Sequence, residues 1–308
     1  MLLCCLSSAA SYEPLDNRTW EHVVAHLTDI SPNNTSDRGE RDAKRLKELD
    51  YHKALETLLP LLSCGNPEIL RLRVIDGIGR CGFREAIPAI EKIVSAPTET
   101  LGLRRLALNI GLRYMESDKA VDIAERYVDD KDEGMRRSAH WVLSDHGGNR
   151  EIMILEKCLK TDRELRANIL FALYGTGNEK VGHLVFKILD VQEVHTNTYI
   201  AWIYSEIMAQ YRIPEASEVM FSLFSHESSR VKRNALVYFI RLPHVTAIPV
   251  MIKYLEDCNE PIYYDGTKGR EDLYKILDLK GITDVQRSRL RDLLDKNSRE
   301  YRRDRICR

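Results

Sequence analysis

The chain has 308 residues, of which 44% are hydrophobic and 30% are charged, a composition typical of a soluble protein with a folded core. Lys and Arg total 46 against 47 Asp and Glu, so the near-neutral chain lacks the bulk charge that attracts nucleic acid or anionic lipid. No run approaches the roughly 18 apolar residues that span a bilayer, so we expect neither membrane insertion nor a nucleic-acid partner.

The seven cysteines occur without a Cys-x-x-Cys spacing, which indicates neither a zinc knuckle nor a disulfide framework. A reducing compartment fits best, and we expect a cytoplasmic protein. The segment Met1 to Ser11 resembles the back half of a secretion signal but lacks the basic n-region. A truncated export signal and a loosely docked N-terminus are both compatible with it.

The N-terminal region, 1–50, is predicted to hold this leader and two capping helices. Thr19 is placed to cap a helix that runs to about Ile30, and a charged helix follows over 40–50. His22 and His26 stand four residues apart, a spacing that two metal ligands on one helix use. No third ligand is evident, so we expect ordinary histidines and no metal site.

A short pattern then recurs: an aliphatic residue, a basic residue, and a small or aliphatic residue three positions later. The five instances are Leu70-Arg71 with Val74, Leu103-Arg104 with Ala107, Met135-Arg136 with Ala139, Leu165-Arg166 with Ile169, and Val231-Lys232 with Ala235. The basic positions lie 33, 32, 30 and 66 residues apart, and a degenerate copy at Asn197-Thr198 with Ala201 divides the last interval. The pattern therefore predicts an array of equal units over 51–280.

Each period contains a second helical pattern, which is clearest at 86–90 and 247–251. Pro88 and Pro249 both follow their basic residue by 17 positions and mark the first turn of a helix. Each unit is thus two helices joined by turns. The predicted pairs are 51–63 with 68–80, 84–94 with 99–115, 118–128 with 133–145, 149–159 with 163–174, 179–189 with 195–209, 214–224 with 228–241, and 245–256 with 270–279.

The C-terminal part departs from the repeat. Cys258 to Gly269 is a longer turn, and loops that interrupt a repeat are often functional, although a tolerated insertion fits equally well. Residues 281–308 are predicted to form a basic capping helix, which begins at Asp284 and runs to Arg308.

The repeat resembles the HEAT-like repeat first named in the phycobilisome bilin lyases, in which an aliphatic-Arg pair opens one helix and Ala-x-Pro-x-Leu opens the next. The resemblance covers roughly 51–280. It implies an all-α fold, an α-solenoid that forms a right-handed superhelix of about six to seven helical hairpins with capping helices at both ends. The family includes scaffolds, adaptors, immunity proteins and a few enzymes, so the resemblance leaves the function open.

Two motifs have competing interpretations. Gly77 to Gly82 matches the dinucleotide fingerprint Gly-x-Gly-x-x-Gly, but here it ends a helix, so we expect a helix C-cap. The basic column is either a phosphate ladder or a set of contacts between neighbouring repeats, and we favour the contacts because acidic turn residues precede it. Its members are Arg71, Arg104, Arg136, Arg166 and Lys232.

Enzymes of related fold provide further alternatives. Trp141 and Asp145 lie one turn apart, with Trp202 two repeats later, which loosely resembles HEAT-like DNA glycosylases. The balanced charge opposes that function, because such proteins neutralise several phosphates. A di-iron hydroxylase would need His-Glu pairs in several repeats, whereas only His226-Glu227 fits. We assign no catalytic residue and no cofactor.

The side of each second helix that faces away from its partner is predicted to form the concave surface. This surface places aromatic side chains beside arginines, the residue types that dominate binding energy at protein interfaces. The candidate binding residues are Arg105, Asn109, Arg137, Trp141, Asn168, Phe171, Tyr174, Tyr199, Ile203, Arg233 and Asn234. A helical phase error of one residue, or a groove filled by the terminal helix, would instead make the aromatics part of the core.

The sequence therefore predicts a non-enzymatic scaffold or adaptor that binds a protein partner on its concave face. A toxin-neutralising immunity protein is one specific version. The alternative from another class is an enzyme that acts on nucleic acid or is a bilin lyase.

Overall fold

The computed structural model describes residues 19–29, 38–115, 117–257, 262–264 and 274–300. The leader, most of the Cys258 to Gly269 turn, residues 270–273 and the basic tail from residue 301 lie outside the described residues. The chain divides into two compact units, Met1–Ile154 and Leu155–Arg308, and each is described by itself.

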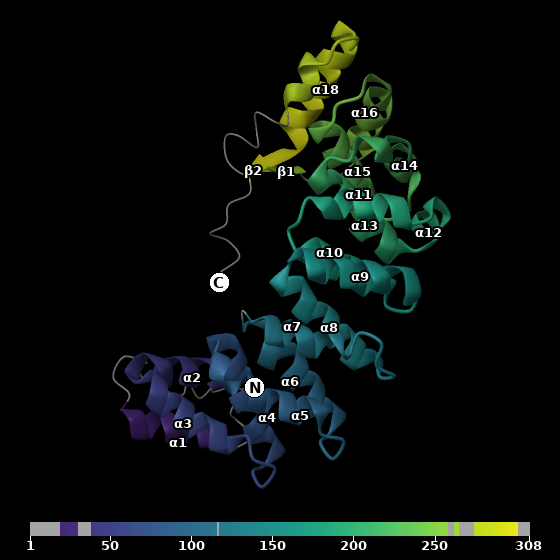
Figure 1. Ribbon diagram of the computed structural model, residues 1–308. Helices are drawn as coiled ribbons and strands as arrows, with labels where there is room; N and C mark the ends of the chain where they lie inside the picture. The colour runs from purple at the N-terminus through teal and green to yellow at the C-terminus, as the bar shows by residue number, and fades with distance from the viewer. Residues whose placement is uncertain (1–18, 30–37, 116, 258–261, 265–273, 301–308) are drawn as a thin grey trace, which may run out of the picture. The chain divides into compact units, whose positions relative to one another are not determined.

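Unit 1 consists of four helical hairpins (Figure 1). The second helices of the hairpins, which we call B helices, pack in the order α2, α4, α6, α8, and each contacts its own first helix. The elements are α1 (Trp20–Thr28), α2 (Arg38–Leu49), α3 (Tyr51–Leu61), α4 (Glu68–Cys81), η2 (Arg84–Ala86), α5 (Ile87–Ser95), α6 (Leu101–Arg113), α7 (Asp118–Glu125) and α8 (Glu133–His146). Because α2 packs on α4 as α4 packs on α6, the N-terminal helices continue the repeat.

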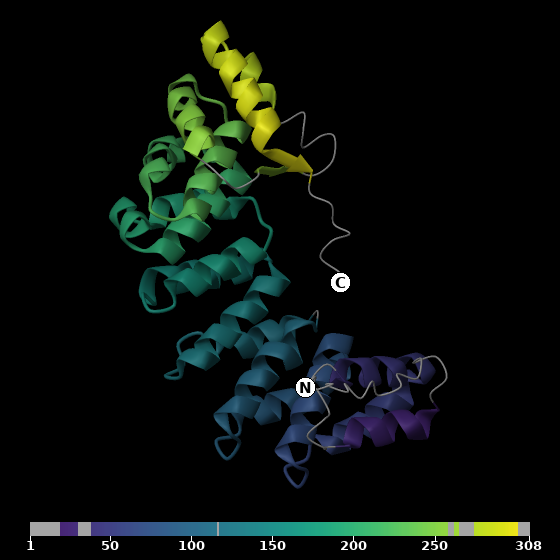
Figure 2. The ribbon, with the colours of Figure 1, turned by 180° about the vertical axis from the view of Figure 1, so that it is seen from behind.

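Unit 2 repeats this arrangement, with B helices in the order α10, α13, α15. Seen from behind, the helices of each unit keep the same stacking order (Figure 2). The elements, beginning with a helix that crosses the unit boundary, are α9 (Asn149–Thr161), α10 (Arg166–Gly175), α11 (Lys180–Ile188), α12 (Val191–Thr196), α13 (Thr198–Tyr211), η3 (Pro214–Ala216), α14 (Ser217–Ser222), η4 (Leu223–Ser225), α15 (Ser229–Arg241), η5 (Val245–Ala247), α16 (Ile248–Asp257), η6 (Lys275–Asp278) and α18 (Asp284–Asn297). The predicted array of paired helices is confirmed as far as α15. Helix α16 instead contacts α18, and of its predicted partner, 270–279, the described part contains only the short 3-10 turn η6.

Local sequence sets where the helices begin and end. The side chains of Asp50, Thr100, Asp132 and Asn197 each accept a hydrogen bond from a backbone N–H in the first turn that follows. Gly82 ends α4 in the left-handed region at φ 66°, which confirms that the Gly-x-Gly-x-x-Gly motif is a helix C-cap.

The helical phase predicted from the repeat is correct in its buried positions. The aliphatic residue that opens each pattern and the residue four positions later are buried in all five clear copies. These pairs are Leu70 and Val74, Leu103 and Ala107, Met135 and Ala139, Leu165 and Ile169, and Val231 and Ala235. The repeated pattern therefore marks the apolar face of each B helix, which is buried against the first helix of its hairpin.

The basic column joins the helices of the repeats. In four copies the guanidinium donates to a backbone carbonyl in the last turn of the preceding first helix or in the segment that follows it: Arg71 to Leu62, Arg104 to Val94, Arg136 to Asp130, and Arg166 to Leu159. Arg71 also pairs with Glu99, and Arg166 with Glu193, in the next repeat. These contacts support the structural interpretation of the column, because they occupy the groups that a phosphate would need.

The C-terminal region differs from the prediction in two respects. Helix α18 ends at Asn297, short of Arg308, and the next residues form strand β2 (Ser298–Glu300). Strand β1 (Ile262–Tyr264), within the predicted longer turn, pairs in parallel with β2. The helical periodicity of Asp284 onward cannot reveal such a pair, because its partner strand lies more than thirty residues earlier. At the other end, Thr19 precedes α1 without a side-chain capping bond.

Candidate functional site

The side of the B helices that faces away from their hairpins is the candidate site, and we call it the B-face. In unit 1 the guanidinium of Arg113 lies over two rings, 5.4 Å from the ring centroid of Tyr114 and 5.3 Å from that of Trp141. Arg113 also makes two hydrogen bonds to Asp145, one of them 3.1 Å long. Trp141 is half-buried, and the guanidinium of the Arg113–Asp145 ion pair lies over its ring.

The remaining candidates of unit 1 are mostly engaged within the chain. Arg105 forms a bidentate pair with Asp132, which also caps α8, and Arg137 pairs with Glu133 on its own helix. The hydrogen bond from Arg105 holds the pKa of Asp132 below its usual range. Asn109 is half-buried, and its side-chain oxygen has no hydrogen-bond partner among the described residues.

In unit 2 the B-face carries an aromatic patch, which we define as Phe171 and Tyr174 on α10 with Tyr199, Trp202 and Tyr211 on α13. The rings of Phe171 and Trp202 meet edge to face with centroids 4.9 Å apart, and those of Tyr174 and Tyr211 lie 6.5 Å apart. Tyr199 is 69% exposed. Large aromatic area left at the surface is typical of a binding site.

Arginines border the aromatic patch on α15. The guanidinium of Arg230 lies 3.5 Å from the ring centroid of Trp202. Arg241 donates to the carbonyl of Ala209. The pKa of Tyr174 is raised, first by burial and then by the nearby charge of Glu206.

Two candidate residues do not lie on the B-face. Ile203 is 1% exposed and belongs to the core, and Asn234 is buried, where it donates to the hydroxyl of Ser205. The expected exposure of both was wrong. Asn197 caps α13, so the degenerate copy starts its helix later than the pattern assumed, and half-buried Trp202 takes the surface position instead of Ile203.

The repeat pattern did not place Trp202 or Arg230 among the candidate binding residues, although the two lie in contact. The capping preference of Asn197, which fixes the start of α13, is the signal that would have found Trp202. Asn168 and Arg233 are half-buried on their helices, and their role in binding stays a prediction.

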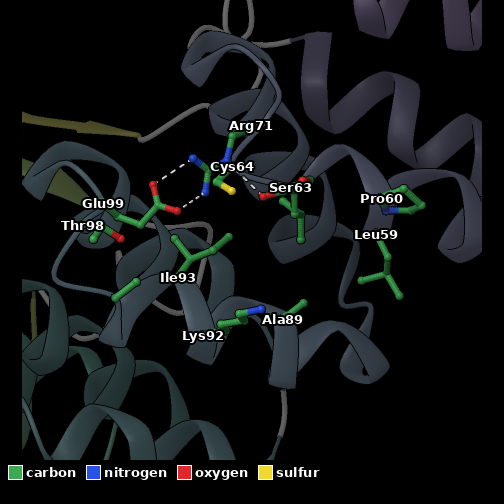
Figure 3. Close-up of a pocket in the computed structure, with 12 residues that line it drawn as sticks. Leu59, Pro60, Ser63, Cys64, Arg71, Ala89, Lys92, Ile93, Thr98 and Glu99 are labelled. Carbon is green, nitrogen blue, oxygen red and sulfur yellow. Dashed lines mark hydrogen bonds and ion pairs between the residues drawn. The ribbon is translucent and has the colours of Figure 1, made fainter.

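A separate cavity of about 400 Å³ lies in unit 1, between the ends of α3 and α5. The Arg71–Glu99 pair closes one end, whereas Leu59 and Pro60 line the other (Figure 3). The walls are mainly apolar, and Lys92 and the free thiol of Cys64 also line them. The cavity has room for a small apolar group, but its charged end is already neutralised within the chain.

One member of the histidine pair on α1, His26, makes a structural contact. His26 contacts the buried carboxylate of Asp42 at 2.6 Å and so joins α1 to α2. Within the described residues, no group of three or more potential ligands is placed to hold a metal ion. None of the described helices is long and apolar enough to cross a membrane.

Comparison with known proteins finds helical-repeat structures. No family model and no curated protein matches the chain. The complex of CpcE and CpcF of phycocyanin lyase from Nostoc sp. PCC7120 has a TM-score of 0.43 at 18% identity, covering 78% of this chain and 93% of that one. An engineered protein scores 0.47 at 15% identity, covering 90% of this chain and 77% of that one.

A designed armadillo repeat protein in complex with the peptide (KR)4 has a TM-score of 0.36 at 14% identity, covering 72% of this chain and 98% of that one. These likenesses concern the fold alone. The chain's own paired helices make it a HEAT-like helical array.

Proposed function

We propose that the chain is a non-enzymatic binding module that holds a protein partner on the B-face. The single observation that carries the proposal is Tyr199, a large aromatic side chain that remains 69% exposed on α13. The same helix carries half-buried Trp202, whose ring contacts Phe171. Aromatic and arginine side chains supply most of the binding energy at protein interfaces. A scaffold or adaptor, with a toxin-neutralising immunity protein as one version, fits this surface, and we place it in the cytoplasm.

The enzyme alternatives are less well supported. A DNA glycosylase would need Asp145 beside Trp141 as a reacting carboxylate, yet both Asp145 oxygens accept hydrogen bonds from Arg113. Both oxygens of this carboxylate are thus already occupied by the guanidinium of Arg113, which leaves neither open to a substrate. A bilin lyase remains the other alternative, and no described residue specifically favours it.

The proposal predicts that Tyr199 contributes to binding and little to folding. Tyr199→Ala should change the free energy of unfolding by no more than about 0.5 kcal/mol, because exposed sites contribute little. The same change should weaken partner binding by roughly thirtyfold, the effect of losing an interface hot spot. The measurement is quantitative mass spectrometry of proteins recovered on the tagged chain from its native host, beside urea denaturation.

Met153→Ala on α9 is the matched control, since Met153 is also 69% exposed. It should leave both stability and recovery unchanged. Equal recovery by the wild type and both variants would contradict the proposal, as would equal loss in both variants.

A further inference from the structure

Two arginine–tryptophan pairs occur on the B-face, one in each unit, and they differ in charge balance. In unit 1 the stacked guanidinium of Arg113 is neutralised by Asp145, which lies one helical turn beyond Trp141. In unit 2 the guanidinium of Arg230 lies closer to its ring, 3.5 Å from the centroid of Trp202. Arg230 is exposed and has no carboxylate partner among the described residues.

The carboxylates around the second pair do not supply that partner. Glu227, three residues before Arg230, accepts a hydrogen bond from the hydroxyl of Thr198 at 3.2 Å. Glu206, one turn beyond Trp202, forms no ion pair with Arg230, and its charge acts on Tyr174. The arrangement of arginine, tryptophan and carboxylate is thus complete in unit 1 and lacks its anion in unit 2.

The helices that carry the second pair have a basic excess. Helix α15 contains Arg230, Lys232, Arg233 and Arg241 and no acidic residue, whereas α13 contains the single acid Glu206. The near-zero net charge of the whole chain conceals this local surplus. Arg230, whose charge no described carboxylate offsets, therefore makes this part of the B-face complementary to a partner with negative charge.

We propose that the aromatic patch of unit 2 binds an acidic segment of a partner protein, with an Asp or Glu of that segment on Arg230 as Asp145 lies on Arg113. An apolar side chain next to that acid contacts Tyr199 and Phe171. This inference rests on the proposed protein-binding function and specifies the chemistry of the partner.

The proposed contact draws on both features of the pair. A guanidinium binds a carboxylate through two parallel hydrogen bonds, and the tryptophan ring below holds the guanidinium plane in position. A partner that covers Tyr199 also excludes water from Arg230, which strengthens the ion pair. Protein is favoured over nucleic acid as occupant, because a single arginine without a carboxylate partner offers few phosphate contacts.

The test uses the full chain and labelled, capped peptides in which leucine alternates with glutamate, glutamine or lysine, with fluorescence anisotropy as the readout. The glutamate peptide should bind most tightly, and added salt should weaken its binding. Arg230→Gln should weaken that binding about tenfold, the effect of losing one charge-assisted contact. Lys187→Gln, which removes an exposed charge on α11, should leave it unchanged.

A charge reversal separates recognition from folding. Arg230→Glu should lose the glutamate peptide and gain the lysine peptide, while its helical circular dichroism stays that of the wild type. Each of three results would overturn the inference: equal binding of the glutamate and glutamine peptides, no binding of the glutamate peptide, or tighter binding of oligothymidylate, a single-stranded nucleic acid titrated in the same assay. If partner recovery still depends on Tyr199 in those cases, the protein-binding proposal stands and only the acidic partner falls.

Discussion

Ala139→Asp is expected to abolish the cooperative unfolding transition of the protein. Ala139 on α8 is fully buried at the position four residues after Met135, where the repeat inserts its small side chain into the hairpin. An unpaired carboxylate at such a site costs several kcal/mol even after relaxation, which is comparable with the total stability of about 5 to 15 kcal/mol of a folded domain. Circular dichroism during a thermal scan checks the result.

The control for Ala139→Asp is Ala167→Asp, the same substitution on the other side of a B helix. Ala167 is half-buried in the first turn of α10, where an acidic residue interacts favourably with the helix dipole. It should retain a cooperative transition with nearly unchanged stability. A folded Ala139→Asp protein, or an unfolded Ala167→Asp protein, would show that the helical phase is wrong.

Arg71→Met is expected to lower the free energy of unfolding by about 3 to 5 kcal/mol, because breaking a buried ion pair leaves one charge without compensation. The side chains of Arg71 and Glu99 are 6% and 14% exposed, and Arg71 also donates to the carbonyl of Leu62. The control Arg137→Met breaks an exposed pair with Glu133 and should cost at most about 0.5 kcal/mol. Urea denaturation measures both, and equal effects would contradict the structural role of the basic column.

The same pair predicts how stability responds to acid. The hydrogen bond from Arg71 lowers the pKa of Glu99 below its unfolded value, against the opposing effect of burial. Glu99 therefore stabilises the fold above the unfolded pKa, and this contribution disappears as pH falls through the folded pKa. Below about pH 5 the wild type should lose more unfolding free energy than Glu99→Gln, in which this group no longer titrates.

The repeat pattern predicted the fold well because packing is local and periodic. Residues such as Leu103 and Ala107 are buried for the same reason in every copy, so a pattern read in one repeat applies to the others. The parallel pairing of β1 with β2 has no such periodicity. It joins segments that lie far apart in the chain, and a three-residue strand leaves little trace in the sequence.

The candidate site was harder to predict, because one residue of helical phase decides between core and surface. Tyr199 and Phe171 lie at the surface as predicted, but Ile203, on the same helix as Tyr199, is buried. Helix α13 starts later than the pattern assumed, and half-buried Trp202 takes the surface position. The cation on Trp202 comes from Arg230 on a neighbouring helix. Contacts between helices of different repeats depend on side-chain rotamers, which a pattern along one helix does not specify.

Photo-crosslinking in the native host tests the central claim most directly, namely that the B-face of unit 2 binds a protein. A photoreactive amino acid replaces Tyr199 in one variant and Met153 in another, two side chains with the same exposed fraction of 69%. The proposed function predicts that the Tyr199 variant yields one dominant crosslinked protein, which is absent from the Met153 variant. Failure to crosslink at Tyr199, or the same mixture of products from both positions, would contradict it.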